Sequence, residues 1–270
     1  MTRTLASMGR AGSLCMLAVV TLLAACSTTT TVTERRDTRV VSEPADPERR
    51  ARVRLELAGL YFGRGQNSTA LDEIKTALAA KPDMPEAYGL RGLVYASMGD
   101  ARLAEESFLR ALQLAPTEGN TMHSYAWFLC QERRYPEAEV QFEKALVQPQ
   151  YRDGVRTLLA QGVCQARAGR WTESERTLSR SYELDPANPV TAFNLSEVLL
   201  RRGELDRARF YVRRINSVPD QVTSQSLWLA ARIDRRLGNF DALQDHGRQL
   251  RDRFPQSPEM LLFDRGRFDE

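Results

Sequence analysis

The sequence predicts an all-α protein, a right-handed superhelical solenoid built from about six helix-turn-helix units. The first observation is a period of 34 residues, which separates Pro82 from Pro116 and Ala70 from Ala104. The second is a glycine between the two helices of nearly every unit, where the chain must turn. The third is that no run of alternating apolar and polar residues, the pattern of a half-buried strand, occurs. A repeat at this period indicates one supersecondary unit stacked on its neighbours.

The spacing within each unit explains how its two helices pack. A small residue opens the second helix, an aromatic or aliphatic residue four positions later fills the groove, and another small residue follows after three more positions. These residues share one helix face. This pattern resembles the tetratricopeptide repeat (TPR), a helix-turn-helix unit of about 34 residues. The units begin near Ala51, Pro85, Gly119, Val155, Pro189 and Ser224.

The units differ in how closely they follow the pattern. Glycine stands at the turn of every unit except the third, where Arg133 replaces it. In the fourth unit Ser174 and Ser181 replace the alanines of the second helix, and Gln161 and Gln165 occupy positions that are usually apolar. We therefore expect the fourth unit to lack small-residue contacts. The sixth unit has Leu243 and Gly247 at its contact positions, which is consistent with an atypical terminal cap.

The N-terminus has the three parts of a secretory signal. Arg3 and Arg10 precede an apolar run that ends in Leu23-Ala24-Ala25-Cys26. About ten apolar residues are too few to span a bilayer, which needs roughly 20. We predict that residues 1–25 are a cleaved signal peptide, that 26–47 are the lipidated cysteine and a flexible tether, and that 48–255 form the solenoid, followed by a C-terminal tail over 256–270.

The small-small-cysteine ending resembles bacterial lipoprotein signals. The resemblance implies that Cys26 becomes the first mature residue and carries acyl chains such as palmitate, which anchor the protein without spanning the membrane. Ser27 follows the cysteine, where an aspartate usually implies retention in the inner membrane. We therefore expect a lipid anchor on the periplasmic face of the outer membrane. The alternative is an ordinary secretory signal with a cysteine at this position by chance.

Composition and charge argue against nucleic-acid binding. The formal net charge is +3, and basic residues alternate with acidic ones, as in Arg201-Arg202-Gly203-Glu204-Leu205-Asp206-Arg207. A nucleic-acid surface needs a one-sided basic patch. We expect a solvated surface rich in salt bridges instead.

The sequence lacks the residue constellations of an enzyme. His123 and His246 are the two histidines, and neither belongs to an H-E-x-x-H pattern. Cys130 and Cys164 lack the C-x₂-C partners of a zinc site. No phosphate-binding loop of the G-x-x-x-x-G-K-[ST] type and no G-x-S-x-G elbow occurs. We expect no catalytic site, no metal site and no cofactor.

A short run in the third unit is more specific than the repeat itself. It reads Ser124-Tyr125-Ala126-Trp127-Phe128-Leu129-Cys130-Gln131, and Arg134-Tyr135-Pro136-Glu137-Ala138 follow it. This run resembles the third-repeat signature of the PilF/PilW lipoproteins of type IV pilus biogenesis, with Ala126 in place of the family's usual glycine. Members of that family are pilotins, which promote outer-membrane localisation and multimerisation of the secretin ring. The resemblance implies a secretin partner, with other pilus-assembly proteins as further partners.

TPR arrays bind partners on the concave surface made by their first helices. The large apolar residues at the corresponding positions are Leu55, Phe62, Leu93 and Trp127. Exposed in an empty groove, they would mark an interaction site, and we expect units one to three to bind a secretin segment there. The alternative is that they pack into neighbouring repeats as core.

Two cysteines remain in the mature chain, Cys130 and Cys164. A pair in an oxidising compartment suggests a disulfide, and both residues fall near the same level of adjacent first helices. Such a bond would contribute about 3–4 kcal/mol by restricting the unfolded chain. Two buried free thiols are the alternative.

Two other functions fit the same fold, because a fold alone does not specify a function. One is a periplasmic TPR lipoprotein that scaffolds proteases or cell-wall enzymes. The other is a hydrolase with a site that the sequence motifs do not reveal.

Overall fold

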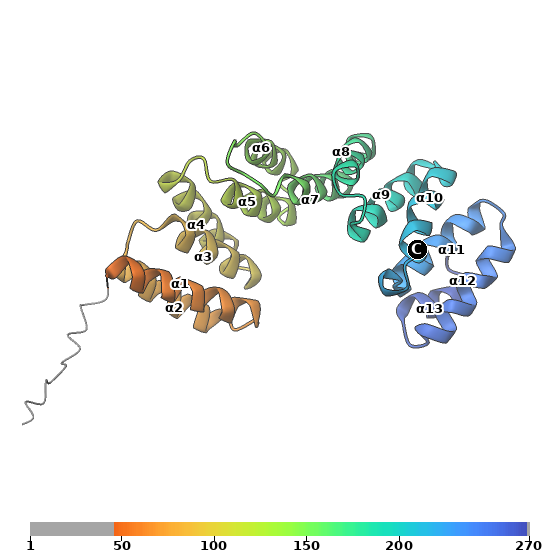
Figure 1. Ribbon diagram of the computed structural model, residues 1–270, viewed down its shortest axis with the longest axis horizontal. Coiled ribbons are helices and arrows are strands. Elements are labelled where there is room, and N and C mark those ends of the chain that lie inside the picture. Colours follow the sequence, from red (N-terminus) through yellow and green to blue (C-terminus); the bar gives the residue numbers. More distant parts are fainter. Residues whose placement is uncertain (1–45, 269–270) are drawn as a thin grey trace, which may run out of the picture. The chain divides into compact units, whose positions relative to one another are not determined.

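The computed structural model describes residues 46–268, and every regular element within that range is helical (Figure 1). Thirteen α-helices and one short 3₁₀ turn are present there, and the predicted all-α fold is confirmed. The predicted signal peptide, Cys26 and the tether through residue 45 lie outside the described residues. No helix in the described range is both long enough and apolar enough to cross a membrane.

The helices follow one another as six hairpins and a final single helix. The hairpins are α1 (Pro47–Gly63) with α2 (Asn67–Ala80), α3 (Pro85–Ser97) with α4 (Ala101–Leu114), α5 (Gly119–Gln131) with α6 (Tyr135–Leu146), α7 (Gly154–Arg167) with α8 (Trp171–Leu184), α9 (Pro189–Arg202) with α10 (Leu205–Asn216), and α11 (Ser224–Arg236) with α12 (Phe240–Arg253). The 3₁₀ turn η1 (Pro219–Gln221) precedes α11, and α13 (Pro258–Asp264) ends the series.

Local chemistry explains where the first helices begin. Proline occupies the first position of α1, α3 and α9, where a missing N–H costs no hydrogen bond. The Asp46 side chain accepts from the Glu48 backbone N–H and caps α1, so the helix begins at Pro47, where the predicted tether ends. Thr223 and Ser226 form a reciprocal capping box at α11.

The turn inside each hairpin needs a residue in the left-handed region. Gly65, Gly99, Gly169, Gly203 and Gly238 have φ between 72° and 79° there. In the third hairpin Arg133 takes the same conformation with φ 61°, at the position where the sequence departs from glycine. A non-glycine residue in this region costs about 1–2 kcal/mol. The same turn geometry therefore occurs in every hairpin, although the third hairpin has arginine in place of glycine.

Within each hairpin, small residues let the two helices approach. Gly92 in α3 faces the ring of Phe108 in α4 so closely that an added Cβ would lie 2.8 Å from the ring atoms. Ala104 and Ala111 flank Phe108 on α4, and all three are buried. A comparable close approach occurs beyond the last hairpin, where an added Cβ on Gly247 of α12 would overlap the ring of Phe263 in α13. Thus α13 covers the contact face of the sixth hairpin as a terminal cap.

The fourth hairpin keeps its close contacts, which corrects the expectation from its serines. Ser174 and Ser181 on α8 are fully buried. The Ser174 hydroxyl donates to the carbonyl of Gly162 at 2.7 Å, and the Ser181 hydroxyl donates to the carbonyl of Val155 at 3.2 Å. A serine is only one oxygen larger than alanine, and each hydroxyl has a partner, so the helices approach without a buried unpaired group.

The glutamines of the fourth hairpin take part in the joint with the third. Gln161 and Gln165 on α7 donate their side-chain amides to one oxygen of Glu139 at 2.7 and 2.9 Å. Arg170 donates to the other oxygen of Glu139 at 2.6 Å. Their polar character at usually apolar sites is therefore explained by one carboxylate on α6 that they surround.

Glu139 is one of four equivalent charged residues that join neighbouring hairpins. Each directly follows the first small residue of a second helix, and each forms an ion pair with the next hairpin. The pairs are Glu105 with Arg134 at 2.8 Å, Glu139 with Arg170 at 2.6 Å, Glu175 with Arg202 at 2.8 Å and with Arg207 at 2.6 Å, and Arg209 with Asp234 at 2.9 Å. We call these four residues the joint charges. They confirm the expected salt-bridged surface around Arg201–Arg207, and they show that the sign of the charge reverses at the last joint.

Candidate protein-interaction surfaces

The first helices of successive hairpins form one continuous inner row. Each contacts the next directly, from α1 with α3 through to α9 with α11. Each second helix packs against its own first helix and against the first helix of the following hairpin. Side chains that point away from both partners on the first helices therefore lie along the inner row.

A hollow of about 360 Å³ opens on this inner row, and we call it the central hollow. It is formed by three consecutive first helices, α5, α7 and α9. Its lining is mainly apolar and consists of His123, Trp127, Arg156, Leu159, Ala160, Val163, Val190 and Asn194. The Arg167 guanidinium lies over the ring of Trp127, 4.9 Å from its centroid. A mostly apolar concavity with a few polar groups is the usual form of a binding site.

His123 contributes no charge to the central hollow at neutral pH. Its Nδ1 lies 2.9 Å from the hydroxyl of Thr157, which also contacts the Tyr151 hydroxyl at 2.6 Å. Burial, and secondarily the nearby Arg156 charge, lowers the pKa of His123 to about 4. The ring is thus neutral at pH 7, and Arg156 is the charged residue of the lining.

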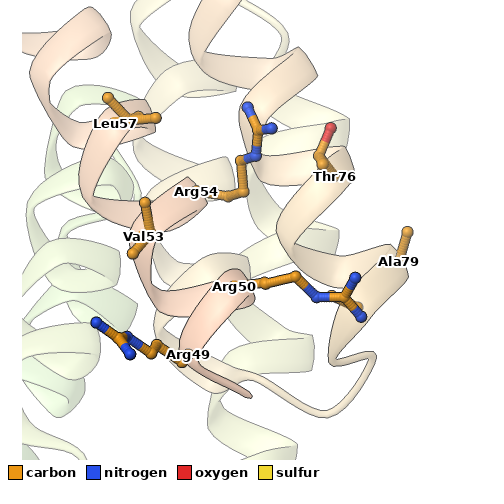
Figure 2. Close-up of a pocket in the computed structure, with 8 residues that line it drawn as sticks. Arg49, Arg50, Val53, Arg54, Leu57, Thr76 and Ala79 are labelled. Atoms are coloured by element: carbon orange, nitrogen blue, oxygen red, sulfur yellow. The ribbon is translucent and has the colours of Figure 1, made fainter. Parts of the chain in front are cut away.

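A second hollow, of about 670 Å³, lies on the first hairpin, and we call it the repeat-one hollow (Figure 2). Val53 and Leu57 of α1 face Ala79 and Ala80 of α2 across it, and Val53 is 49% exposed. Its other lining residues are Arg49, Arg50, Arg54 and Thr76. Exposed apolar side chains grouped in this way usually mark a contact surface.

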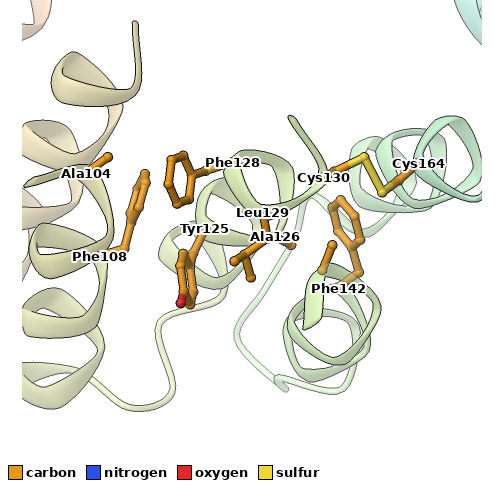
Figure 3. Close-up of a cluster of buried hydrophobic side chains, with 10 residues drawn as sticks. Ala104, Phe108, Tyr125, Ala126, Phe128, Leu129, Cys130, Phe142 and Cys164 are labelled. Carbon is orange, nitrogen blue, oxygen red and sulfur yellow. A yellow bond between two sulfur atoms is a disulfide. The ribbon is translucent and has the colours of Figure 1, made fainter. Parts of the chain in front are cut away.

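The run from Tyr125 to Cys130 packs into the core at the joint of the second, third and fourth hairpins (Figure 3). The rings of Tyr125 and Phe128 on α5 point toward Phe108 on α4, with centroid distances of 5.6 and 5.7 Å. The Tyr125 hydroxyl donates to Glu105 at 2.7 Å, so the core connects directly to a joint charge. Trp127, in the middle of the run, is only partly buried and reaches the central hollow.

The structure contains a disulfide between Cys130 on α5 and Cys164 on α7, with 5.9 Å between their Cα atoms (Figure 3). Both residues are 1% exposed and belong to the same core cluster as Phe142. The bond links α5 and α7, two neighbouring first helices that both contribute to the lining of the central hollow.

The structure separates the four residues that the sequence groups into one binding groove. Leu55 and Phe62 are partly buried against the core of the first hairpin, and Leu93 is partly buried against the next core cluster. Trp127 is the one that lines a described hollow. The repeat-one hollow uses a different face of α1, on which Val53 and Leu57 lie.

Sequence reasoning missed most of the central hollow. Leu159 and Val163 stand ten and six residues before the turn glycine of their hairpin, as His123 and Trp127 do before Arg133. This equivalence of position was the available signal. The sequence-based prediction named large apolar residues in units one to three only, so it did not extend to Leu159 and Val163 of the fourth unit.

The described residues contain no cluster of three or more metal-binding side chains. His246 on α12 contacts the buried Asp234 at 3.0 Å, and Asp234 also pairs with the joint charge Arg209. This arrangement joins α10, α11 and α12 and leaves the histidine in a structural contact.

Comparisons with known proteins agree with this geometry. The family model described as "Tetratricopeptide repeat" matches residues 55–118 and 129–189. The type IV pilus assembly protein PilF of Pseudomonas aeruginosa is 24% identical over 218 residues, which cover 81% of this chain and 85% of PilF.

Solved structures are similar over most of both chains. The crystal structure of PilW, described as a widely conserved type IV pilus biogenesis factor, has a TM-score of 0.73 and 29% identity, covering 78% of this chain and 96% of PilW. The structure of Pseudomonas aeruginosa PilF has a TM-score of 0.69 and 21% identity, covering 82% of this chain and 99% of that one. The chain therefore contains tetratricopeptide repeats, is homologous to PilF and is similar in sequence and structure to PilW.

Proposed function

We propose that this protein is an outer-membrane lipoprotein of type IV pilus biogenesis that acts as a pilotin. It is anchored on the periplasmic face through Cys26, binds the pilus secretin and promotes secretin localisation and multimerisation. It acts as a scaffold without a catalytic site, and other pilus-assembly proteins are further partners. The observation that carries the proposal is the similarity to PilF and PilW over most of each chain.

The repeat-one hollow is the surface that we assign to the secretin. Val53 and Leu57 present apolar side chains that no other hairpin covers within the described range, and three arginines surround them. Burying apolar area in an interface contributes about 25 cal/mol per Å², so these two aliphatic residues favour the contact. The sequence predicts that units one to three bind the secretin segment. The assignment narrows this region to unit one and places the contact on the face of α1 that carries Val53 and Leu57.

The experiment is a pull-down of the secretin with the variant Val53→Glu plus Leu57→Glu. The matched control is Val140→Glu plus Leu184→Glu, an exposed valine and an exposed leucine on second helices. Loss of secretin with the first variant and retention with the control supports the assignment. Substituting Leu55 and Phe62 would be less informative, because both residues also pack on the core.

Secretin multimers and surface pili report on the function as a whole. Deletion should abolish both, whereas unchanged pili with altered cell-wall turnover would contradict a pilotin and favour a scaffold for cell-wall enzymes. Cys26→Ala should prevent labelling with a palmitate analogue, leave secretin binding intact and misplace the assembled secretin. Binding of secretin by the folded Val53→Glu plus Leu57→Glu variant at the level of wild type would refute the repeat-one assignment.

A further inference from the structure

The last described residues bind to the inner surface of the sixth hairpin. Phe268 is 9% exposed, and its ring stacks on Trp228 of α11 with 5.0 Å between centroids. Arg232 donates from Nε to the backbone carbonyl of Phe268 at 3.2 Å, and Arg235 donates to the carbonyl of Gly266 at 3.1 Å. The chain's own C-terminal segment is thus held by an aromatic contact and by two arginines that donate hydrogen bonds to its backbone carbonyls.

The residues that hold Phe268 are equivalent in position to those that line the central hollow. Trp228 and Arg232 stand ten and six residues before the turn glycine Gly238. The residues at the same two positions in the third and fourth hairpins are His123, Trp127, Leu159 and Val163, all of which line the central hollow. The inner row therefore carries the same kind of contact position twice. It is filled at the sixth hairpin by the chain itself and open at the third and fourth hairpins.

The charged side chains at the central hollow favour acidic peptide segments over neutral or basic ones. Among the described residues, neither Arg156 nor Arg167 has a carboxylate within salt-bridge distance, although most other arginines of the joints do. His123 is neutral there. Two guanidinium groups without carboxylate partners attract a negative charge.

We propose that the central hollow binds an extended segment of a partner protein through one aromatic side chain, with an acidic residue beside it paired to Arg156. The aromatic ring lies against Trp127 and the aliphatic side chains of α7 and α9, as Phe268 lies against Trp228. This surface is distinct from the repeat-one hollow, so the protein holds two partners, or two segments of one partner, at the same time.

A fluorescein-labelled peptide, Gly-Ser-Asp-Phe-Asp-Ser-Gly, is the probe, and its fluorescence anisotropy is measured with the purified full chain. Two further peptides carry alanine in place of phenylalanine or lysine in place of both aspartates. We expect the parent peptide to bind at least about tenfold more tightly than either, a difference of about 1.4 kcal/mol, because each of the other peptides lacks one of the two proposed contacts. Equal binding of the phenylalanine and alanine peptides, or no binding of the parent peptide up to about 1 mM, where association contributes only about 4 kcal/mol, would overturn the proposal.

Two pairs of surface variants locate the site. Val190→Glu puts a carboxylate into the hollow, whereas Val140→Glu changes a valine of similar exposure, 47% against 54%, on a second helix. Arg156→Glu reverses the charge of the lining, and Arg213→Glu reverses an exposed arginine on α10. We expect Val190→Glu and Arg156→Glu to weaken the parent peptide about tenfold or more by like-charge repulsion, and the two controls to leave it unchanged.

The charge swap is the decisive comparison. Arg156→Glu should bind the lysine peptide more tightly than wild type does, because the new carboxylate attracts the lysines. A variant that is merely misfolded could not gain affinity for this peptide. Weakening of both peptides by Arg156→Glu, or binding of the parent peptide by Val190→Glu at the wild-type level, would refute the site. Secretin binding by the same variants is measured in parallel by pull-down. Loss of peptide binding at the central hollow can then be distinguished from loss of secretin binding at the repeat-one hollow.

Discussion

Removing the disulfide by Cys130→Ala plus Cys164→Ala is expected to destabilise the joint between the third and fourth hairpins by about 4 kcal/mol. The bond closes a loop over a sequence separation of 34 residues. The chain-entropy relation gives a loss of about 13 cal/mol/K for such a loop in the unfolded state, or about 3.8 kcal/mol at 25 °C. Both cysteines are buried, so the alanines also lose some apolar contact, which adds to the effect.

The destabilisation should be local, because each hairpin contacts mainly its neighbours. Hydrogen exchange measured by mass spectrometry should therefore quicken in α5 to α8 and change little in α1 and α2. Urea unfolding followed by circular dichroism gives the size of the effect, and reduction of the wild-type protein provides an independent way to open the loop.

The reduced wild type and the double variant should lose similar stability, since both have lost the same loop constraint. A variant whose unfolding free energy lies within about 1 kcal/mol of the oxidised wild type would refute the entropic account at this joint. Faster exchange spread evenly over all thirteen helices of the described range would refute the claim that the effect is local.

Three further predictions follow from single positions. Arg133→Gly should stabilise the protein by up to about 1 kcal/mol by relieving a left-handed backbone, and Gly169→Ala should destabilise it by a similar amount; urea midpoints measure both. Gly92→Ala should cost about 1–2 kcal/mol against the ring it faces, whereas Gly59→Ala, with no heavy atom within 4 Å, should be neutral or stabilising, as thermal unfolding will show. His123 has a pKa lowered to about 4 when folded, so the unfolded state takes up its proton first as pH falls below 6.5. Stability is therefore complete above pH 6.5 and falls by about 2 kcal/mol at pH 5, and the variant His123→Gln should lack this component of the loss in urea titrations at the two pH values.

The sequence predicts the helices well because the TPR pattern is local. A small residue, an apolar residue and another small residue on one face of a helix describe a contact within a single hairpin, and the spacing alone specifies it. Ser174 shows where this logic fails. Its hydroxyl finds the Gly162 carbonyl only after α7 and α8 have packed, so a pattern of residue types counted it as a missing contact.

The binding surfaces depend on more than one hairpin, and this limited their prediction. The central hollow needs α5, α7 and α9 side by side, and Val190 contributes only because the fifth hairpin stacks on the fourth. On α1, Val53 and Leu55 are two residues apart and so lie on different faces of the helix. Size and apolarity alone did not tell which of the two faces a neighbour covers.

The joint charges make the order of the hairpins a property of the sequence. Glu105, Glu139 and Glu175 each require a cation from the hairpin that follows, whereas Arg209 requires the carboxylate of Asp234. A chimera that moved the sixth hairpin to follow the third would bring Asp234 toward Glu139, and two carboxylates at the joint would repel each other. The solenoid is repetitive in backbone, yet its hairpins are not interchangeable parts, and any attempt to lengthen or shorten it must preserve the sign of the charge at every joint.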